Sequence, residues 1–178
     1  MKKITVHWTG GGPKPNSTDK QHYHYLVSQD KAIHSGVFKP QANIPGPRGL
    51  INGTYAAHCG GGNSNNIGVA LCGMRGYTGP AHVGDYPIRR QQCEAAWELV
   101  ANLCMQYGIA VTPETVMTHA EFGLKHPDTE SAGKVDITWL PHEPELKTPE
   151  AVGSYIRGKV QWYINQKTRS DKPAKAKK

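Results

Sequence analysis

Two helical patterns interrupt a series of short strand-like runs, and this alternation constrains the fold more than any other feature of the chain. Over residues 89–107, apolar side chains recur at helical spacing until Gly108 ends the pattern. A second pattern opens at Thr148, where threonine suits the helix cap and Pro149 suits the first turn. Helices interspersed with strands predict an α/β fold, with one central mixed β-sheet flanked by helices.

The predicted strands are short runs between loops that are rich in glycine and proline. From Lys3 to Trp8, apolar and polar residues alternate, and the run ends at a triple glycine. The run from Asn66 to Gly73 is largely apolar, which suits a strand covered on both faces. Only Pro13–Gln21 separates the first strand from the second, which leaves room for about one or two helical turns. Further extended segments are expected over residues 23–27, 32–37, 116–119 and 134–139.

The length of 178 residues fits a single domain followed by a basic tail. We expect the domain over residues 1–166 and a disordered tail over residues 167–178. The tail carries much of the formal net charge of +7. Such a tail either stays solvated or attracts polyanions, including the anionic polymers of a bacterial envelope. Because terminal charge runs are usually solvated, the tail alone does not predict a nucleic-acid partner.

Neither export nor membrane insertion is predicted by any segment. The first residues carry two lysines but no long apolar stretch, unlike a secretory leader. No run approaches the roughly 20 apolar residues of a membrane helix. We therefore expect synthesis in the cytoplasm and a monomer without stable membrane insertion.

Three residues suit a metal ion. His7 lies at the end of the first strand, directly before the glycine-rich turn, and His119 follows a short extended piece before a long loop. Asp136 lies two residues after Lys134, so in an extended segment both side chains would enter one pocket. Two imidazoles and one carboxylate suit zinc with an open fourth position, where the ion lowers the pKa of water. The long gaps between these residues do not by themselves establish the site.

Five short motifs extend this interpretation. They are Val6-His7-Trp8-Thr9, Tyr23-His24-Tyr25, His58 followed by Asn66-Ile67-Gly68-Val69-Ala70-Leu71, Thr118-His119-Ala120-Glu121, and Lys134-Val135-Asp136. In this order the motifs resemble the zinc-dependent N-acetylmuramoyl-L-alanine amidases. That family includes the small phage lysozyme amidases and is related to the peptidoglycan recognition proteins. The resemblance extends from about residue 3 to residue 165.

The resemblance implies a zinc site and two catalytic side chains. The family's ligands map onto His7, His119 and Asp136, and some members have cysteine in the third place. The family's lysine maps onto Lys134, whose implied role is to stabilise the oxyanion that develops during the reaction. The family's tyrosine maps onto Tyr23, whose phenol can hydrogen-bond the water or the attacked carbonyl. An exposed lysine and a tyrosine that packs on the sheet are the simpler alternatives.

Two other positions bear on the mechanism. His58 precedes the central strand, where family members often have a histidine that contacts substrate; a loop hydrogen bond is the alternative. Ala70 stands where other members have a catalytic glutamate, which resembles the phage type and leaves the proton acceptor open. The remaining six histidines receive no role, and His24 is expected to point away from the metal.

The activity implied by the resemblance is that of an endolysin. Such a protein would cleave the amide between N-acetylmuramic acid and the L-alanine of the stem peptide. It would accumulate in the cytoplasm of the producing cell and reach the wall after the membrane is permeabilised. A recognition module that binds peptidoglycan without cutting it is the main alternative, although Asp136 and Lys134 argue against it. A metal nuclease lacks any visible motif, and the absent glutamate disfavours recycling of soluble muropeptides.

Overall fold

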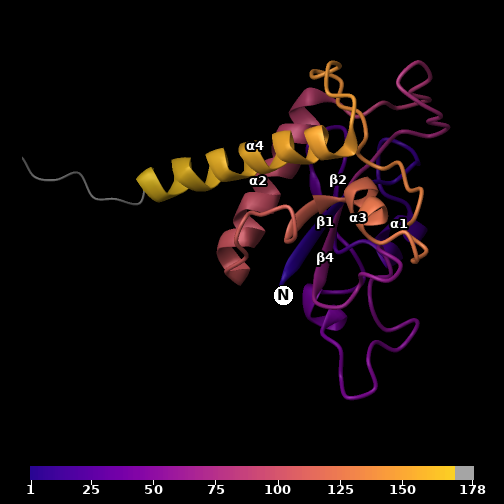
Figure 1. Ribbon diagram of the computed structural model, residues 1–178, viewed down its shortest axis with the longest axis vertical. Coiled ribbons are helices and arrows are strands. Elements are labelled where there is room, and N and C mark those ends of the chain that lie inside the picture. The colour runs from indigo at the N-terminus through magenta and orange to yellow at the C-terminus, as the bar shows by residue number, and fades with distance from the viewer. Residues whose placement is uncertain (171–178) are drawn as a thin grey trace, which may run out of the picture.

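One five-stranded sheet forms the centre of the computed structural model, which describes residues 1–170 (Figure 1). The strand order is β3-β2-β4-β1-β5. The interior strand β1 is parallel to both β4 and β5, and the central strand β4 is also parallel to β2. Only β3 runs antiparallel, against β2, so the sheet is mixed and the predicted α/β fold is confirmed. The strands are β1 (Lys3–Trp8), β2 (Tyr25–Val27), β3 (Ile33–Ser35), β4 (Asn66–Leu71) and β5 (Val116–Thr118).

Two long helices pack against each other and cover one face of the sheet (Figure 1). The first, α2 (Arg90–Tyr107), lies between β4 and β5 in the chain, as its apolar spacing predicts. The second, α4 (Pro149–Ser170), carries its own buried stripe onto α2. The shorter helices are α1 (Ser17–His22), the 3-10 turn η1 (Pro40–Asn43) and α3 (His119–Lys125). Among residues 1–170, no helix has both the length and the apolar character needed to cross a bilayer.

The hydrophobic core fills the space between this sheet face and the two helices. Alternate residues of β1, Ile4, Val6 and Trp8, belong to the core and are almost fully buried. Because successive strand residues point to opposite faces, Thr5 and His7 lie on the other side of the sheet. Both are nevertheless fully buried, because loops cover that second face. The polar side chains of β1 are thus placed in a desolvated layer opposite the helices.

One predicted strand is absent. Residues 134–139 contain no strand but a turn at residues 136–137, where Ile137 adopts a left-handed conformation with φ of 56°. The Ile137 side chain is completely buried in this conformation. The backbone carbonyl of Asp136 accepts a hydrogen bond from Ala120 N at 3.2 Å. The segment therefore packs on the start of α3 and does not join the sheet. Lys134 and Asp136 reach the same pocket through a turn, and the extended segment predicted for them is wrong.

Two segment boundaries also differ from the sequence prediction. Tyr23 is the residue that ends α1, and β2 begins two residues later at Tyr25. Helix α4 continues past residue 166 to Ser170, where Lys167 Nζ donates to Glu98 Oε1 at 2.7 Å. The start of the predicted tail is therefore helical, and the prediction for residues 171–178 lies outside the described residues.

Candidate metal centre

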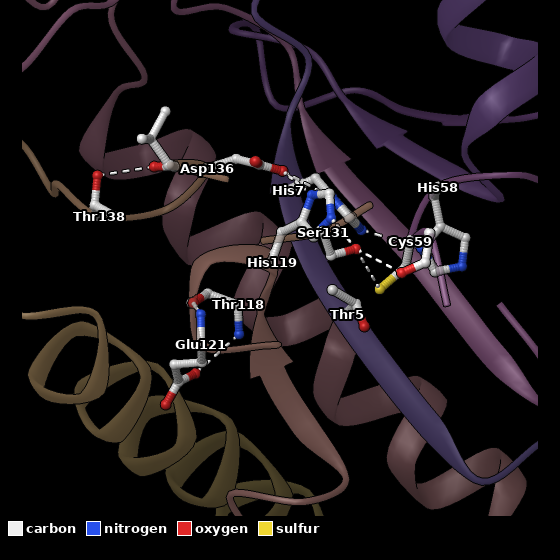
Figure 2. A network of polar contacts seen from close by, with 12 residues as sticks. Thr5, His7, His58, Cys59, Thr118, His119, Glu121, Ser131, Asp136 and Thr138 are labelled. Carbon is white, nitrogen blue, oxygen red and sulfur yellow. Dashed lines mark hydrogen bonds and ion pairs between the residues drawn. The ribbon is translucent and has the colours of Figure 1, made fainter. Parts of the chain in front are cut away.

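The side chains of His7, His119 and Asp136 meet at one point on the loop-covered side of the sheet (Figure 2). His7 Nδ1 lies 3.1 Å from His119 Nδ1 and 2.8 Å from Asp136 Oδ2, and His119 Nδ1 lies 2.9 Å from the same oxygen. Their exposed fractions are 0%, 6% and 9%. Three residues from a span of 129 positions along the chain thus present three ligand atoms in a triangle.

Local structure places each of these side chains. His7 projects from β1, and its partner across the β1–β4 register is Ala70. His119 is the first residue of α3, whose start is fixed by a capping box between Thr118 and Glu121. Asp136 is held in place because its backbone carbonyl accepts a hydrogen bond from Ala120 N in the first turn of α3. The triangle is therefore built on an interior strand of the sheet and a capped helix start, which are rigid supports.

A chain of hydrogen bonds fixes the proton on His119. Ser131 Oγ donates to the Gly60 carbonyl at 2.8 Å, so its oxygen must accept from His119 Nε2, which lies 2.9 Å away. A metal ligand must be a neutral imidazole with a single N–H, and with that hydrogen on Nε2 the Nδ1 lone pair of His119 faces Asp136. Burial lowers the pKa of His7 to about 4, so the His7 ring is neutral near pH 7. A neutral imidazole lone pair facing a carboxylate oxygen at hydrogen-bond distance favours a cation between them.

The donor set and its dimensions suit zinc. Histidine nitrogen and carboxylate oxygen lie about 2.0–2.2 Å from zinc, which places tetrahedral ligands about 3.3–3.5 Å apart. The triangle edges of 2.8–3.1 Å are shorter than that spacing by about 0.2–0.7 Å, a difference that small side-chain shifts can absorb. Three protein ligands leave a fourth position, as in catalytic zinc sites. The residues present therefore fit the ion that the sequence predicts.

A pocket of about 330 Å³ opens directly onto this triangle. Tyr23 lies beside His7, with 5.1 Å between the ring centroids. Burial raises the pKa of the Tyr23 phenol above its usual value, and the Asp136 carboxylate raises it further. Lys134 is exposed at the pocket rim. The residues that line the pocket are Trp8, Thr9, Gly10, His22, Tyr23, Ala57, His58, His119, Lys134 and Asp136.

The sequence of this chain matches one protein family. A sequence model of the N-acetylmuramoyl-L-alanine amidases matches residues 1–136. The chain belongs to this family. No curated protein matches it. The matched segment of this amidase contains all three residues of the triangle, together with Tyr23 and Lys134.

The remaining predicted positions of the amidase are placed as follows. His58 is buried and lines the pocket, and its ring contacts that of His7 in an edge-on arrangement. Ala70, beside His7 on β4, contributes no carboxylate to the site. His24 is buried but does not line the pocket, because its ring nitrogens bond Asn43 Oδ1 and the Gly68 amide, each at 2.9 Å. The predicted site residues other than His7 therefore line one pocket, and His7 meets His119 and Asp136 beside it.

Two contributors to the site were not predicted from the sequence. Helix α3 lies where a loop was expected, although Thr118 and Glu121 have the spacing of a capping box, which is readable in the sequence. Ser131 contacts His119 from twelve residues away along the chain and carries no local signal. Such a contact depends on the tertiary arrangement of the loop after α3.

Proposed function

We propose that this amidase uses one zinc ion to hydrolyse the bond between N-acetylmuramic acid and the L-alanine of the stem peptide. The observation that carries the proposal is the triangle of His7 Nδ1, His119 Nδ1 and Asp136 Oδ2, which faces an open pocket. Family membership gives the class of bond, and the donor set gives the class of metal. Zinc at this position would polarise the scissile carbonyl and lower the pKa of water.

Lys134 is proposed to stabilise the oxyanion of the tetrahedral intermediate. Lys134 lines the same pocket as the proposed ligands His119 and Asp136. A cation that is already placed beside the reacting carbonyl stabilises negative charge that appears only as the reaction proceeds. This differential stabilisation lowers the barrier without tightening substrate binding to the same extent.

Tyr23 is proposed to donate a hydrogen bond to the substrate or to the attacking water. Its raised pKa keeps the phenol protonated at neutral pH, so it acts as a donor and not as a base. His58 is proposed to lie beside the bound substrate, because it lines the pocket. Every proposed site residue comes from one chain, and we propose that the monomer is the active form.

We also propose that the substrate is intact cell wall, as for an endolysin that is made in the cytoplasm and released to the wall. The formal charge of +7 favours association with anionic wall polymers. The presence of Ala70 beside His7, where recycling enzymes of the family would place a glutamate, supports the same assignment. A binding module that does not cleave peptidoglycan is the second candidate, but it would not require Lys134 and Tyr23 around a complete ligand set.

Digestion of purified peptidoglycan sacculi tests the proposed reaction. Mass spectrometry should detect free stem peptides with an N-terminal L-alanine, and a chelator should suppress them. Asp136→Ala should abolish both zinc binding and product formation. His82→Ala is the matched control, because this exposed histidine lies in a loop outside the pocket. Wall binding without any new amine would contradict the proposed activity, and full activity of Asp136→Ala would remove this residue from the site.

A further inference from the structure

The ring of His58 bridges His7 and the backbone of β4. His58 Nδ1 lies 3.1 Å from His7 Nε2, and His58 Nε2 lies 3.2 Å from the Asn66 carbonyl oxygen. Both rings are buried, and the two meet edge to face (Figure 2). Each ring nitrogen of His58 therefore has a partner within the protein, so the ring can border a bound substrate while its hydrogen bonds go to His7 and Asn66.

The partners determine where the hydrogens lie. A carbonyl oxygen can only accept, so His58 Nε2 carries the hydrogen of this ring. A buried neutral imidazole has no second N–H, so His58 Nδ1 accepts from His7 Nε2. The single hydrogen of His7 is thereby placed on Nε2. Its Nδ1 lone pair then faces His119 and Asp136.

We propose that His58 is a positioning residue that holds His7 in the one tautomer able to coordinate the metal. The inference rests on the proposed zinc site and adds a role for His58 that works through His7. Ser131 acts on His119 in the corresponding way, since it also fixes the hydrogen on Nε2. Both proposed histidine ligands would then present Nδ1, each oriented through a partner that ends on a backbone carbonyl.

The residues around His58 leave space for its ring and hold its backbone and its hydrogen-bond acceptor in place. A Cβ atom on Gly68 would lie 2.6 Å from His58 Cγ, so only glycine at this point of β4 lets the ring approach. The His58 amide donates to Asn63 Oδ1 at 3.0 Å, which anchors the backbone. The Asn66 side chain bonds Thr5 and the Gly62 carbonyl, which fixes the residue whose carbonyl accepts from His58. Ring, backbone and acceptor are thus all held in place.

Two amide substitutions separate the two contacts of the ring. His58→Asn places an amide oxygen near the Nδ1 position, where it can accept from His7. His58→Gln places an amide nitrogen near the Nε2 position, where it can donate only to Asn66. Zinc affinity, measured by competition with a chromophoric chelator, should fall about 10–100-fold in His58→Gln and His58→Ala. His58→Asn should restore most of it, and circular dichroism should show that all three variants are folded.

Nitrogen-15 NMR of the metal-free wild-type protein tests the tautomer directly. His7 should carry its hydrogen on Nε2, and His58→Gln should shift part of the population to Nδ1. A His7 hydrogen on Nδ1 in the wild type would overturn the inference. Equal zinc affinity in all variants, with only KM changed, would also overturn it and assign His58 to substrate contact. A wild type that binds no zinc would instead contradict the proposed function, while the NMR result would still decide the tautomer.

Discussion

At the scale of single residues, each of the two proposed histidine ligands is held by an outer partner. His119 is oriented by Ser131, and His7 is in contact with His58. Asp136 faces both imidazoles with one oxygen. Because these side chains are buried, an incorrect rotamer would leave polar atoms without partners at a cost of about 1–3 kcal/mol each. The outer contacts therefore preorganise the triangle for a cation.

Removing the Lys134 ammonium should impair the reaction more than metal binding. We expect Lys134→Ala to keep its zinc and to lose about 2.7–4 kcal/mol of transition-state stabilisation, which is a 10²–10³-fold lower kcat. Steady-state rates and metal content of the purified variant provide the measurement. Lys147→Ala serves as the control, since Lys147 is also exposed but does not line the pocket. A lower metal content with unchanged turnover per bound zinc would contradict the oxyanion role.

Tyr23→Phe should remove a hydrogen-bond donor while it preserves the aromatic contact with His7. We expect kcat to fall by about 10²-fold or more. Because burial raises the pKa of Tyr23, the wild-type donor stays protonated across neutral and mildly alkaline pH. The pH–rate profile between about pH 7 and 10 should therefore have the same shape in both proteins. An alkaline limb that disappears in Tyr23→Phe would show that the tyrosine ionises in this range.

An ion pair links α3 and α4 at the scale of secondary structure. Arg157 of α4 donates to Glu121 Oε1 at 3.0 Å, and Glu121 also caps the start of α3 through the Thr118 amide at 2.9 Å. Gly153 of α4 makes room for this carboxylate, because a Cβ there would lie 2.0 Å from Glu121 Oε2. The helix that begins with His119 is thereby fixed against the core.

Two glycines of α4 provide a matched test of this packing. Gly158→Ala should raise the free energy of unfolding by about 0.5–1 kcal/mol, because alanine favours the helix and nothing lies within 4 Å of the new Cβ. Gly153→Ala should lower it by about 1–3 kcal/mol, because the Cβ displaces Glu121. Urea unfolding of both variants gives the comparison. If both substitutions raised the free energy of unfolding, the close contact between Gly153 and Glu121 would not contribute to stability as proposed.

The sequence predicts elements better than it predicts how they meet. The spacing in α2 and the alternation in β1 are local properties, and both elements form where expected. Residues 134–139 also alternate, but the left-handed Ile137 and its burial depend on tertiary packing that no local pattern contains. The site shows the same division. His7 and His119 could be proposed from strand ends and a family resemblance, whereas the contact of Ser131 with His119 could not.

Charge is the property of the whole molecule that bears most on access to the wall. The formal charge is +7, and residues 171–178 contribute four lysines and one aspartate, or +3 of that total. An anionic wall polymer attracts such a protein at long range, and salt screens the attraction over about 8–10 Å at physiological ionic strength. Association with sacculi should therefore depend on salt in a way that the hydrolytic step does not.

Deleting residues 171–178 should weaken this dependence, because the formal charge falls from +7 to +4. We expect lower activity on sacculi at low salt and a shallower decline as salt increases. Turnover of a small soluble muropeptide should be the same for both proteins, which makes it the internal control. Identical salt profiles on sacculi would show that the tail does not contribute to wall association.

Reconstitution of metal-free protein tests the central claim most directly. After a chelator has been applied and removed, zinc is returned in steps while the release of stem peptide from sacculi is followed. Activity should be absent without metal, rise in proportion to added zinc and reach a plateau at one equivalent per chain. Undiminished activity in the metal-free protein, or a plateau that requires two equivalents, would contradict a single catalytic zinc at His7, His119 and Asp136.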